Sequence, residues 1–485
     1  MFQFMRAADL AHVLGRQDLG DRLTDEQFIA AEIKRFRQSR RFRDMYNGER
    51  YYKGLHDVLH KKRTAIGDDG DLIEVDNLPN NRVVNNQYRK MVDQKVNYLL
   101  SQPFVLDSEN KAYTDAVKPY LLNHNFRKLL KSVGKDVMNG GIGWIFPFYD
   151  EAGELSFRRF RPDEIIPLWQ DAEHSRLEAA IRVYELLAYE GKNEKVVQKV
   201  EVFNPDGIHY FELRDGNLIP EAPFHEPYFV VTDHQGGSQA YNWERIPLVA
   251  FRRNEEEQPL ICSCKSLQDG LNQIESMWQD QTEEDPRNTI LVIVNYDGQR
   301  LGEFRRNLAT YGAVKVRSDN GVQGDVKSLQ IQVNAENYKA IIDVFKKAII
   351  ENCMGYDAKD DRLGSNANEM NLQSMYSDIE MDAKGMEAEF RSSLEELLWF
   401  VNCHLSNSGA GDFDEEDFHI VFNRDMMLNE SKVIEDCRKS VGLISNRTIV
   451  ANHPYVDDLD EELKQMQKEQ QEQLNLYGDF GKEKP

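Results

Sequence analysis

The chain has 485 residues, of which 40% are hydrophobic and 29% are charged, and its formal net charge is −23. The length predicts about two to four domains. Because proteins that grip duplex DNA neutralise its phosphates with an excess of Lys and Arg, the acidic balance argues against an ordinary DNA-binding protein. No segment approaches the roughly 18 apolar residues of a membrane-spanning helix, and we expect neither a membrane span nor a secretory leader.

Residues 24–62 carry a helical pattern, and its start, Thr24 with Gln27 three residues later, has the form of a capping box. The segment is rich in Arg and Lys, which is typical of a solvated helix face. His56 and His60 stand four residues apart on this helix, a spacing that suits a metal ion. No third ligand is apparent nearby, so a solvated face is the preferred interpretation and no metal site is predicted.

Two further helical segments follow a loop at 64–82. The stretch VVNNQYRKMVDQKVNYLLSQPF repeats apolar residues at helical spacing and ends at Pro103. Residues 110–139 predict one or two helices that close at Gly140 and Gly141.

From about residue 142 to residue 254 the hydrophobic period changes to two. Short alternating stretches such as ELSFRRFRP, KVVQKVEVFN and GIHYFELRDG are separated by turn signals such as EAGE, NPDG and RDGN. The pattern predicts an antiparallel β region.

Helical periodicity returns on both sides of a small insert. Residues 265–283 and 335–354 each carry one apolar stripe, and the insert between them predicts a strand, a helix and two more strands. The polar loop GYDAKDDRLGSNANEM then leads into one very long helix at 369–405, with a bend expected at Gly385. Because these helices lack an obvious partner layer, we expect neighbouring copies of the chain to cover them, as head-to-tail contacts do in a ring.

The C-terminal part predicts an acidic loop, SGAGDFDEEDFH, a last strand, FHIVFNRD, and several helices. Asn429 is a candidate N-cap for one short helix, and Ser445 or Asn446 for the next. The stretch DDLDEELKQMQKEQQEQL predicts a polar helix.

Catalytic signatures are absent from the sequence. None of the patterns GxxxxGK[ST], GxSxG and HExxH occurs. Four acidic clusters, at 68–71, 283–286, 412–417 and 457–462, offer paired carboxylates for Mg²⁺, but they lie in predicted loops and helix ends, where solvated charges are typical. The five cysteines form no metal-binding pattern and favour free thiols.

The order of elements resembles the phage portal proteins of long-tailed double-stranded DNA phages, over roughly residues 80–470. Five stretches carry the resemblance. NRVVNNQYRKMVDQKVNYLLSQPF is similar to the family's early helix, RIPLVAFRRNEEEQ with SLQDGLNQIESMWQDQTEE to the strand and first stem helix, and TILVIVNYDG to the strand entering the clip. The helix, loop and long helix of 335–405 are similar to the second stem helix, tunnel loop and wing helix, and VGLISNRTIVANHPYVDDLDEELKQMQKEQ to the crown. Ser101 and Gln102 stand where the family often has glycine, and QPLICSC replaces a usually polar stretch.

The resemblance implies an α+β, mainly α-helical subunit with long stem and wing helices, an antiparallel β region in the wing, a small αβ clip and a helical crown. The implied divisions are the wing at 1–263, the first stem helix at 264–288, the clip at 289–333, the second stem helix at 334–354, the tunnel loop at 355–368, the long wing helix and return strand at 369–428, and the crown and C-terminal tail at 429–485.

The resemblance also implies a function, that of a non-enzymatic portal protein without a cofactor. Its subunits would form a ring, a dodecamer in the family, at one capsid vertex, in a virion assembled in the host cytoplasm. Double-stranded DNA would pass through the channel during packaging and ejection. The implied partners are terminase, head-completion or adaptor proteins, and the major capsid and scaffolding proteins. An acidic channel wall suits this role, because fixed cations would trap the DNA.

Three groups of residues take the implied roles. Gly355 and Gly364 are expected to permit sharp bends in the tunnel loop. Residues of that loop would meet the DNA: Asp357, Lys359, Asp360, Asp361, Arg362, Asn366 and Asn368. Apolar stem residues would pack between subunits: Leu271, Ile274, Trp278, Ile342, Phe345 and Ile349. Basic clip residues would form the docking surface: Arg300, Arg305 and Arg306.

Two other functions stay open on the residues alone. One is a Mg²⁺-dependent nucleic-acid enzyme that uses an acidic cluster. The other is a non-viral helical scaffold protein that binds partners through its polar C-terminal helix. The loop at 355–368 has its own alternative, a plain surface turn.

Overall fold

The computed structural model describes residues 24–66, 71–76, 78–190, 193–232, 237–284, 290–294, 325–329, 335–357, 369–413, 416–424, 430–451, 453, 455–456 and 462–470. The chain divides into two compact units, Met1–Asn423 and Arg424–Pro485. Within the described part, every helix is too short or too polar to traverse a lipid bilayer.

The N-terminal helical segment is two helices rather than the one predicted. Helix α2 (Asp25–Gln38) starts with the predicted capping box, in which Thr24 and Gln27 exchange side-chain and backbone hydrogen bonds. Ser39 has an extended backbone and ends α2, and its hydroxyl caps α3 (Arg40–Tyr52) by accepting a backbone N–H at 3.1 Å. A serine that satisfies the backbone of the next turn competes with helix continuation, so the break falls at this residue.

The end of the predicted N-terminal helix is instead the 3₁₀ turn η1 (Asp57–His60), with His56 at its N-cap. His56 is fully buried whereas His60 is exposed, so the preferred interpretation of a solvated face is wrong for His56 and holds for His60. Its Nε2 lies 3.0 Å from the carbonyl oxygen of Tyr51, and its Nδ1 lies 2.7 Å from the side-chain nitrogen of Asn272.

Three helices form the centre of the first unit: α4 (Gln87–Leu100), α5 (Lys111–Leu121) and α6 (His124–Gly140). Residues 110–139, for which one or two helices were predicted, therefore form two. Helix α6 ends at Gly141, whose φ of 79° lies in the left-handed region that favours glycine. Helix α4 is the most enclosed of the three, and its fully buried residues include Tyr88, Met91, Val92, Val96 and Leu99.

The predicted β region is confirmed as antiparallel. A five-stranded sheet has the order β10-β9-β8-β7-β6, a three-stranded sheet has the order β13-β4-β5, and β11 pairs with β12. The strands of the large sheet are β6 (Ile165–Trp169), β7 (Leu177–Glu190), β8 (Asn193–Asn204), β9 (Gly207–Arg214) and β10 (Asn217–Glu226). The others are β4 (Ile142–Tyr149), β5 (Leu155–Phe160), β13 (Val249–Arg252), β11 (Phe229–Thr232) and β12 (Ser238–Tyr241).

Helices cover the two main sheets on their apolar faces. Ile29 and Ile33 of α2 pack against residues of the five-stranded sheet. The three-stranded sheet packs under the long helix α10 (Glu369–Asn407), where the rings of Phe251 and Phe390 meet edge to face at 5.1 Å. Aromatic contacts of this kind add to area burial.

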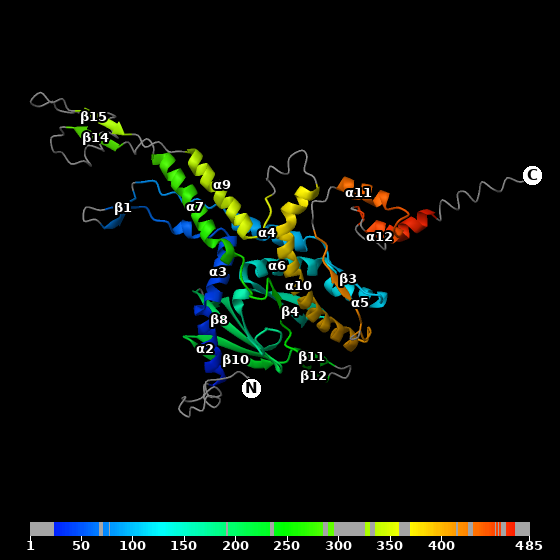
Figure 1. Ribbon diagram of the computed structural model, residues 1–485. Coiled ribbons are helices and arrows are strands. Elements are labelled where there is room, and N and C mark those ends of the chain that lie inside the picture. Colours follow the sequence, from blue (N-terminus) through cyan, green and yellow to red (C-terminus); the bar gives the residue numbers. More distant parts are fainter. Residues whose placement is uncertain are drawn as a thin grey trace, which may run out of the picture. The chain divides into compact units, whose positions relative to one another are not determined.

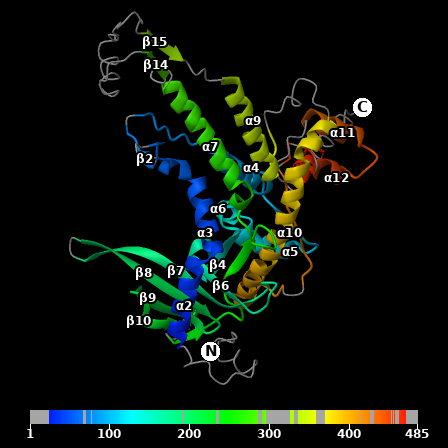
Figure 2. The ribbon, with the colours of Figure 1, turned by 60° about the vertical axis from the view of Figure 1, so that its left-hand side comes forward.

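The predicted order of helix, insert, helix and very long helix is observed. Helix α7 (Ile261–Glu284) leads to strand β14 (Ile290–Val294), which pairs antiparallel with β15 (Asp325–Leu329), and α9 (Ala335–Asn352) then returns toward α10. Figure 2 shows α7 and α9 side by side as a helical hairpin. Strand β15 covers the first two residues of the predicted strand SLQIQV and begins three residues before it, and the rest of SLQIQV lies outside the described residues. The predicted insert helix lies outside the described residues.

Two small pairings complete the first unit. Strands β1 (Thr64–Ile66) and β2 (Leu72–Glu74) form an antiparallel pair where the sequence predicted only a loop. The last predicted strand is β16 (His419–Val421), and it pairs with β3 (Val105–Asp107) directly after α4 (Figure 1).

The second unit contains helices α11 (Glu430–Lys439) and α12 (Asn446–Ala451), and residues 462–470 are also helical. Of the two candidate caps for α12, the structure favours Ser445, whose hydroxyl accepts the N–H of Thr448 at 3.2 Å. Asn429 lies outside the described residues. All five cysteines of the chain are free thiols.

Candidate functional site

The candidate site is the connection between α9 and α10, where the sequence predicts a tunnel loop. The described residues reach Asp357 on one side and resume at Glu369 on the other. Asp357 is half-buried at the end of the described segment. The remaining predicted loop residues lie outside the described part: Lys359, Asp360, Asp361, Arg362, Gly364, Asn366 and Asn368. The described residues therefore form the base of the loop.

The chain leaving α9 is fastened to α4. The Gln94 side chain makes two hydrogen bonds with Tyr356, donating to its carbonyl at 2.8 Å and accepting its N–H at 3.1 Å. Lys95 donates to the carbonyl of Met354 at 3.1 Å. The predicted bend at Gly355 lies one residue too late in the sequence. The residue with the left-handed backbone is Met354, whose φ is 51°. Gly355 serves close approach instead, since a Cβ there would lie 2.7 Å from the Met91 sulfur.

A buried ion pair ties the same part of α4 to α10. Lys95 Nζ lies 2.6 Å from Asp382 Oδ2, and Arg253 Nη2 lies 3.3 Å from Asp382 Oδ1. Burial lowers the pKa of Lys95 below its usual range, although the carboxylate of Asp382 opposes that shift. Removal of one member of such a pair leaves a buried charge without its partner, so the cluster fixes the position of α10 against α4.

Three tyrosines complete the base of the loop. The rings of Tyr356 and Tyr376 lie 4.6 Å apart, and the ring of Tyr98 stacks on Tyr376 at 6.1 Å. The Tyr98 hydroxyl donates to Glu380 Oε2 at 2.7 Å. Both ends of the connection are thus held against α4, one at Tyr356 and the other at Tyr376.

The two predicted stem helices pack on each other as an antiparallel hairpin. The ring of Trp278 stacks on Tyr338 at 6.2 Å near one end, and Gly270 faces the ring of Phe345 nearer the other. The Tyr338 hydroxyl also donates to Gln281 Oε1 at 2.9 Å. Gly270 allows this approach because a Cβ there would lie 2.7 Å from Phe345 Cε1.

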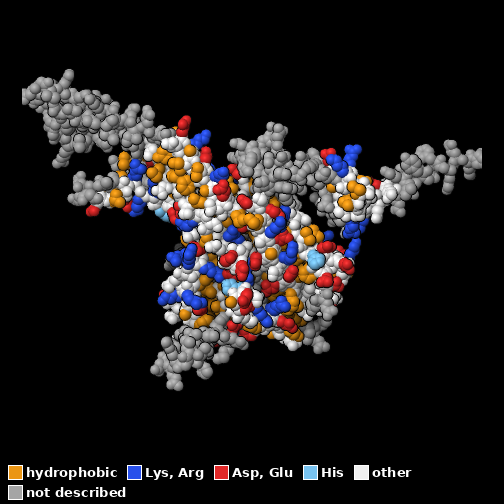
Figure 3. All heavy atoms as spheres, in the orientation of Figure 1, with side chains coloured by type: hydrophobic (Ala, Val, Ile, Leu, Met, Phe, Trp, Pro, Cys, Tyr) orange, Lys and Arg blue, Asp and Glu red, His pale blue; other side chains and the backbone are white. Residues whose placement is uncertain are grey.

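This packing corrects part of the stem prediction. Leu271, Ile342 and Ile349 are buried within the chain itself, so neighbouring copies are not what covers them. Three other predicted residues are partly buried against the same core: Ile274, Trp278 and Phe345. The apolar residues that stay open on the hairpin are different ones: Met277, Ile341 and Val344, which are 39%, 44% and 66% exposed. Hydrophobic side chains gather over this hairpin in Figure 3.

Helix α7 carries a polar ladder that its sequence pattern did not reveal. Gln268, Asn272, Ser276 and Asp280 recur every four residues and are all fully buried. We call these four residues the α7 ladder.

The α7 ladder binds the backbone of the chain that enters α4. It accepts backbone N–H groups from four residues at distances between 2.6 and 3.0 Å: Asn81, Val83, Asn85 and Tyr88. The available signal was the Asn-rich stretch NNRVVNNQ, which needs polar partners when it is buried.

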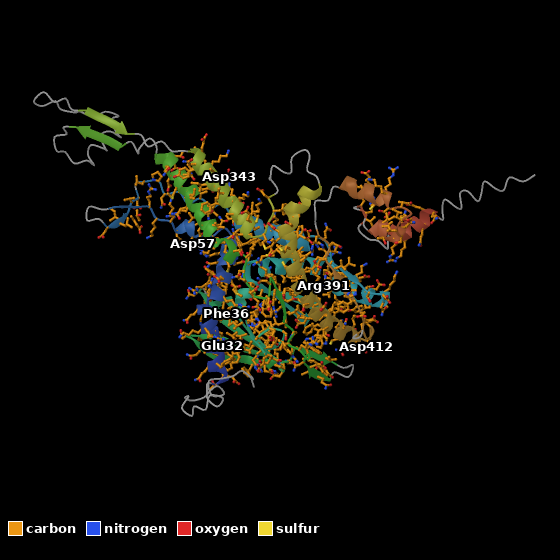
Figure 4. The ribbon with its side chains drawn as sticks, in the orientation of Figure 1. Glu32, Phe36, Asp57, Asp343, Arg391 and Asp412 are labelled. Atoms are coloured by element: carbon orange, nitrogen blue, oxygen red, sulfur yellow. The ribbon has the colours of Figure 1, made fainter. Side chains whose placement is uncertain are left out.

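Charged side chains reinforce the junction between this segment, α3 and α7. Asp280 accepts from Lys61 and lies 3.6 Å from Arg63 Nη1. Asp57 lies where α3 and α7 meet (Figure 4) and bridges Lys265 of α7 to Arg50 of α3. Ion pairs therefore hold helix α7 at Asp280, the last residue of the ladder, and at Lys265, before its first residue.

The predicted docking surface of the insert lies outside the described residues. Only the antiparallel pair of β14 and β15 is described there, with Ile290 opposite Leu329 and Val294 opposite Asp325. Arg300, Arg305 and Arg306 therefore have no described position.

A family model and two similar proteins agree on one family. The model of the family "Phage portal protein, SPP1 Gp6-like" matches residues 31–475. The chain is 28% identical over 441 residues to the portal protein of Bacillus phage SPP1, across 90% of this chain and 85% of that protein. It is 25% identical over 450 residues to the portal protein of Clostridium phage phiCD119, across 90% of this chain and 95% of that protein. A chain of the solved structure "Neck of empty GTA particle computed with C6 symmetry" gives a TM-score of 0.40 at 11% identity, covering 75% of this chain and 88% of that one.

Proposed function

This chain belongs to the SPP1 Gp6-like family of phage portal proteins, and we propose that its subunits form a closed ring at one vertex of the capsid. The match over residues 31–475 is the observation that carries the proposal. The expected ring is a dodecamer with a structural rather than a catalytic role. In this assignment α7 and α9 are the stem helices, β14 and β15 belong to the clip, α10 is the wing helix, and α11 and α12 belong to the crown.

The ring contact would use the open side of the α7–α9 hairpin. Ile341 and Val344 stand three residues apart on α9, so they share one helix face, and Met277 is exposed on α7. Exposed apolar groups gathered on one hairpin are typical of a protein–protein contact. We propose that the α9 face of one subunit packs on the Met277 side of the next, which is a head-to-tail contact that can close a ring.

Double-stranded DNA would pass through the centre of this ring during packaging and ejection. The net charge of −23 on every subunit favours a wall that repels phosphates and lets the duplex slide. The loop between α9 and α10 would reach the DNA with the predicted residues from Asp357 to Asn368. The firm attachment of both loop ends to α4 supports this role, because a loop that meets a moving polymer needs a rigid base.

The remaining partners are those of a portal vertex. Terminase, and later head-completion or adaptor proteins, would dock on the clip, with Arg300, Arg305 and Arg306 as contact residues. The major capsid and scaffolding proteins would surround the ring. The protein would be a virion component assembled in the host cytoplasm.

Ring formation is tested by imaging the purified full chain end on in negative stain. Wild type should give annular particles with a central hole, and Val344→Glu should abolish or strongly reduce them because it places a charge in the apolar contact. Val231→Glu is the matched control, since Val231 is exposed to 51% outside the hairpin. Monomeric wild type at high concentration would refute the ring, and normal rings from Val344→Glu would refute this contact alone.

The channel role is tested by deleting residues 358–366. The deletion leaves the anchors at Tyr356 and Tyr376 in place, so folding and ring formation should persist. DNA packaging or retention of packaged DNA should fall. Normal packaging with this deletion would show that the loop does not serve the DNA, even with the ring intact.

A further inference from the structure

One group of three potential metal ligands lies far along the chain from the hairpin, at the turn between β8 and β9. Among the described residues, Asp206, His209 and His225 are the group whose ligand atoms all lie within 4.8 Å of one another. Asp206 Oδ2 lies 3.7 Å from His209 Nε2 and 4.0 Å from His225 Nε2. Sequence spacing does not reveal this group, because a β-hairpin separates His209 from His225.

Strand register brings the two histidines together. His225 of β10 stands directly opposite His209 of β9 in the antiparallel ladder, and their ring centroids lie 4.8 Å apart. Side chains at such paired positions project from the same face of the sheet. Asp206 lies in the turn between β8 and β9, directly before Gly207. Gly207 makes this approach possible, since a Cβ there would lie 2.3 Å from the carbonyl oxygen of Glu226.

The surroundings of His209 suit a neutral imidazole that binds a metal. The ring stacks on Phe224 at 5.1 Å, which fixes its plane. The Nδ1 atom of His209 lies 3.1 Å from the side-chain nitrogen of Asn204. A flip of the Asn204 amide would place its oxygen at this position instead. That exchange would hold a proton on Nδ1 and leave the Nε2 lone pair facing Asp206.

We propose that Asp206, His209 and His225 bind one divalent transition-metal ion, with Zn²⁺ as the expected occupant. Two imidazole nitrogens and one carboxylate oxygen are a donor set typical of zinc, whereas Mg²⁺ and Ca²⁺ prefer oxygen ligands alone. Zinc bonds of about 2.0–2.2 Å place tetrahedral donors roughly 3.4 Å apart. The two separations from Asp206 Oδ2, 3.7 and 4.0 Å, are slightly longer, and rotation of the Asp206 side chain, which is 65% exposed, can shorten them.

The site would have an open side and an acidic neighbourhood. Three protein ligands leave a fourth position for water. His225 Nε2 now lies 2.9 Å from the carbonyl oxygen of Asp206, a contact that the metal bond would replace. Asp206 and His209 also line a cavity of about 590 Å³ whose wall includes Asp25, Glu26 and Glu178. These carboxylates attract a cation to the cavity.

A bound ion would join the β8–β9 turn to the end of β10 and so stiffen the outer hairpins of the five-stranded sheet. This inference is independent of the portal assignment, because it uses only the three ligands and their geometry.

The test is a metal titration of the chelator-treated full chain. Calorimetry with Zn²⁺ should give one ion per chain, and Co²⁺ should give visible absorption bands of a low-coordinate site. His209→Ala, His225→Ala and Asp206→Asn should each weaken binding at least about tenfold. His419→Ala is the matched control, since His419 is an exposed histidine on another strand, and it should leave binding unchanged.

Circular dichroism of each variant separates loss of a ligand from loss of the fold. Asp206→Asn changes the carboxylate with almost no change in shape, so it remains informative if a histidine variant misfolds. Failure of wild type to bind Zn²⁺ at high-micromolar concentration would overturn the proposal. So would binding that persists at full strength in both histidine variants.

Discussion

Helices α7 and α9 have similar apolar stripes in the sequence but very different surroundings in the structure. Helix α7 buries its apolar stripe against α9 and, on another side, buries the four polar residues of the α7 ladder against the chain that enters α4. Helix α9 is covered on one side, whereas Ile341, Asp343 and Val344 are exposed on another (Figure 4). An apolar stripe therefore shows that a helix needs cover but does not show which chain provides it.

The difference has a physical basis in how each surface is satisfied. The α7 ladder accepts backbone N–H groups from the irregular segment before α4 and from Tyr88 in the first turn of α4, where no intrahelical partner exists. Such buried polar groups stabilise only when all partners are present, which commits α7 to a contact within the chain. The exposed apolar residues of α9 have no such commitment and stay available to a second subunit. We therefore expect changes at the buried positions of α7 to affect folding, and changes at Met277 and on the exposed α9 face to affect assembly.

The largest expected effect is at Asp280 of the ladder. Asp280→Ala leaves Lys61, Arg63 and the Asn81 backbone N–H without their common acceptor, so the free energy of unfolding should fall by about 3 kcal/mol. Urea denaturation of the dissociated subunit measures this loss. Glu283→Ala, an exposed change one turn away, is the control and should stay within about 0.5 kcal/mol of wild type. Equal behaviour of the two variants would mean that the ladder contributes no stability.

A second comparison lies within the apolar residues of the hairpin. Leu271→Ala should lower the free energy of unfolding by about 3 kcal/mol, because Leu271 is fully buried within the chain. Met277→Ala should change it by less than about 0.5 kcal/mol yet weaken the ring, because Met277 is exposed in the single chain. Denaturation and end-on imaging of the same two variants separate the effects. If Leu271→Ala spared stability and lost the ring, the original prediction of an intersubunit Leu271 would be restored.

Much of the fold could be predicted from the sequence because short-range sequence signals mark many of its helices and strands. The capping box at Thr24, the glycine C-cap at Gly141, the period of two over 142–254 and the long helix at 369–405 all follow from short-range rules, and the structure confirms each of them. The family resemblance is also confirmed, by the match over residues 31–475.

The errors share a different cause, which is contact between distant parts of the chain. Hydrogen bonds connect Asn272 to both His56 and Asn85, and sequence spacing does not reveal such pairs. The same holds for Leu271 and Ile349, which are buried in one core shared by α7 and α9. The residues that hold the base of the loop, Gln94 and Lys95, read in sequence as ordinary polar positions of a helix.

The smallest expected effect concerns the pH dependence of folding stability, and it arises at His56, which contacts Asn272 of α7. Burial lowers the pKa of His56 below its usual 6.5, although its contact with the Tyr51 carbonyl and the nearby Asp269 oppose the shift, while Arg50 adds to it. Between pH 6.5 and the lower folded-state pKa, the unfolded chain binds a proton that the folded chain refuses, so folding stability falls as pH falls through this window.

His56→Gln removes the titrating group, so the unfolded chain no longer gains a proton at this position, and the glutamine can still form hydrogen bonds. We expect wild type to be the more stable protein at pH 8 and its advantage over His56→Gln to shrink steadily between pH 7 and pH 5, as measured by urea midpoints. His419→Gln, an exposed change away from α7, should run parallel to wild type over the same range. A constant difference between wild type and His56→Gln would mean that His56 titrates alike in both states. In that case protonation of His56 would not weaken its hydrogen bond with Asn272 of the α7 ladder.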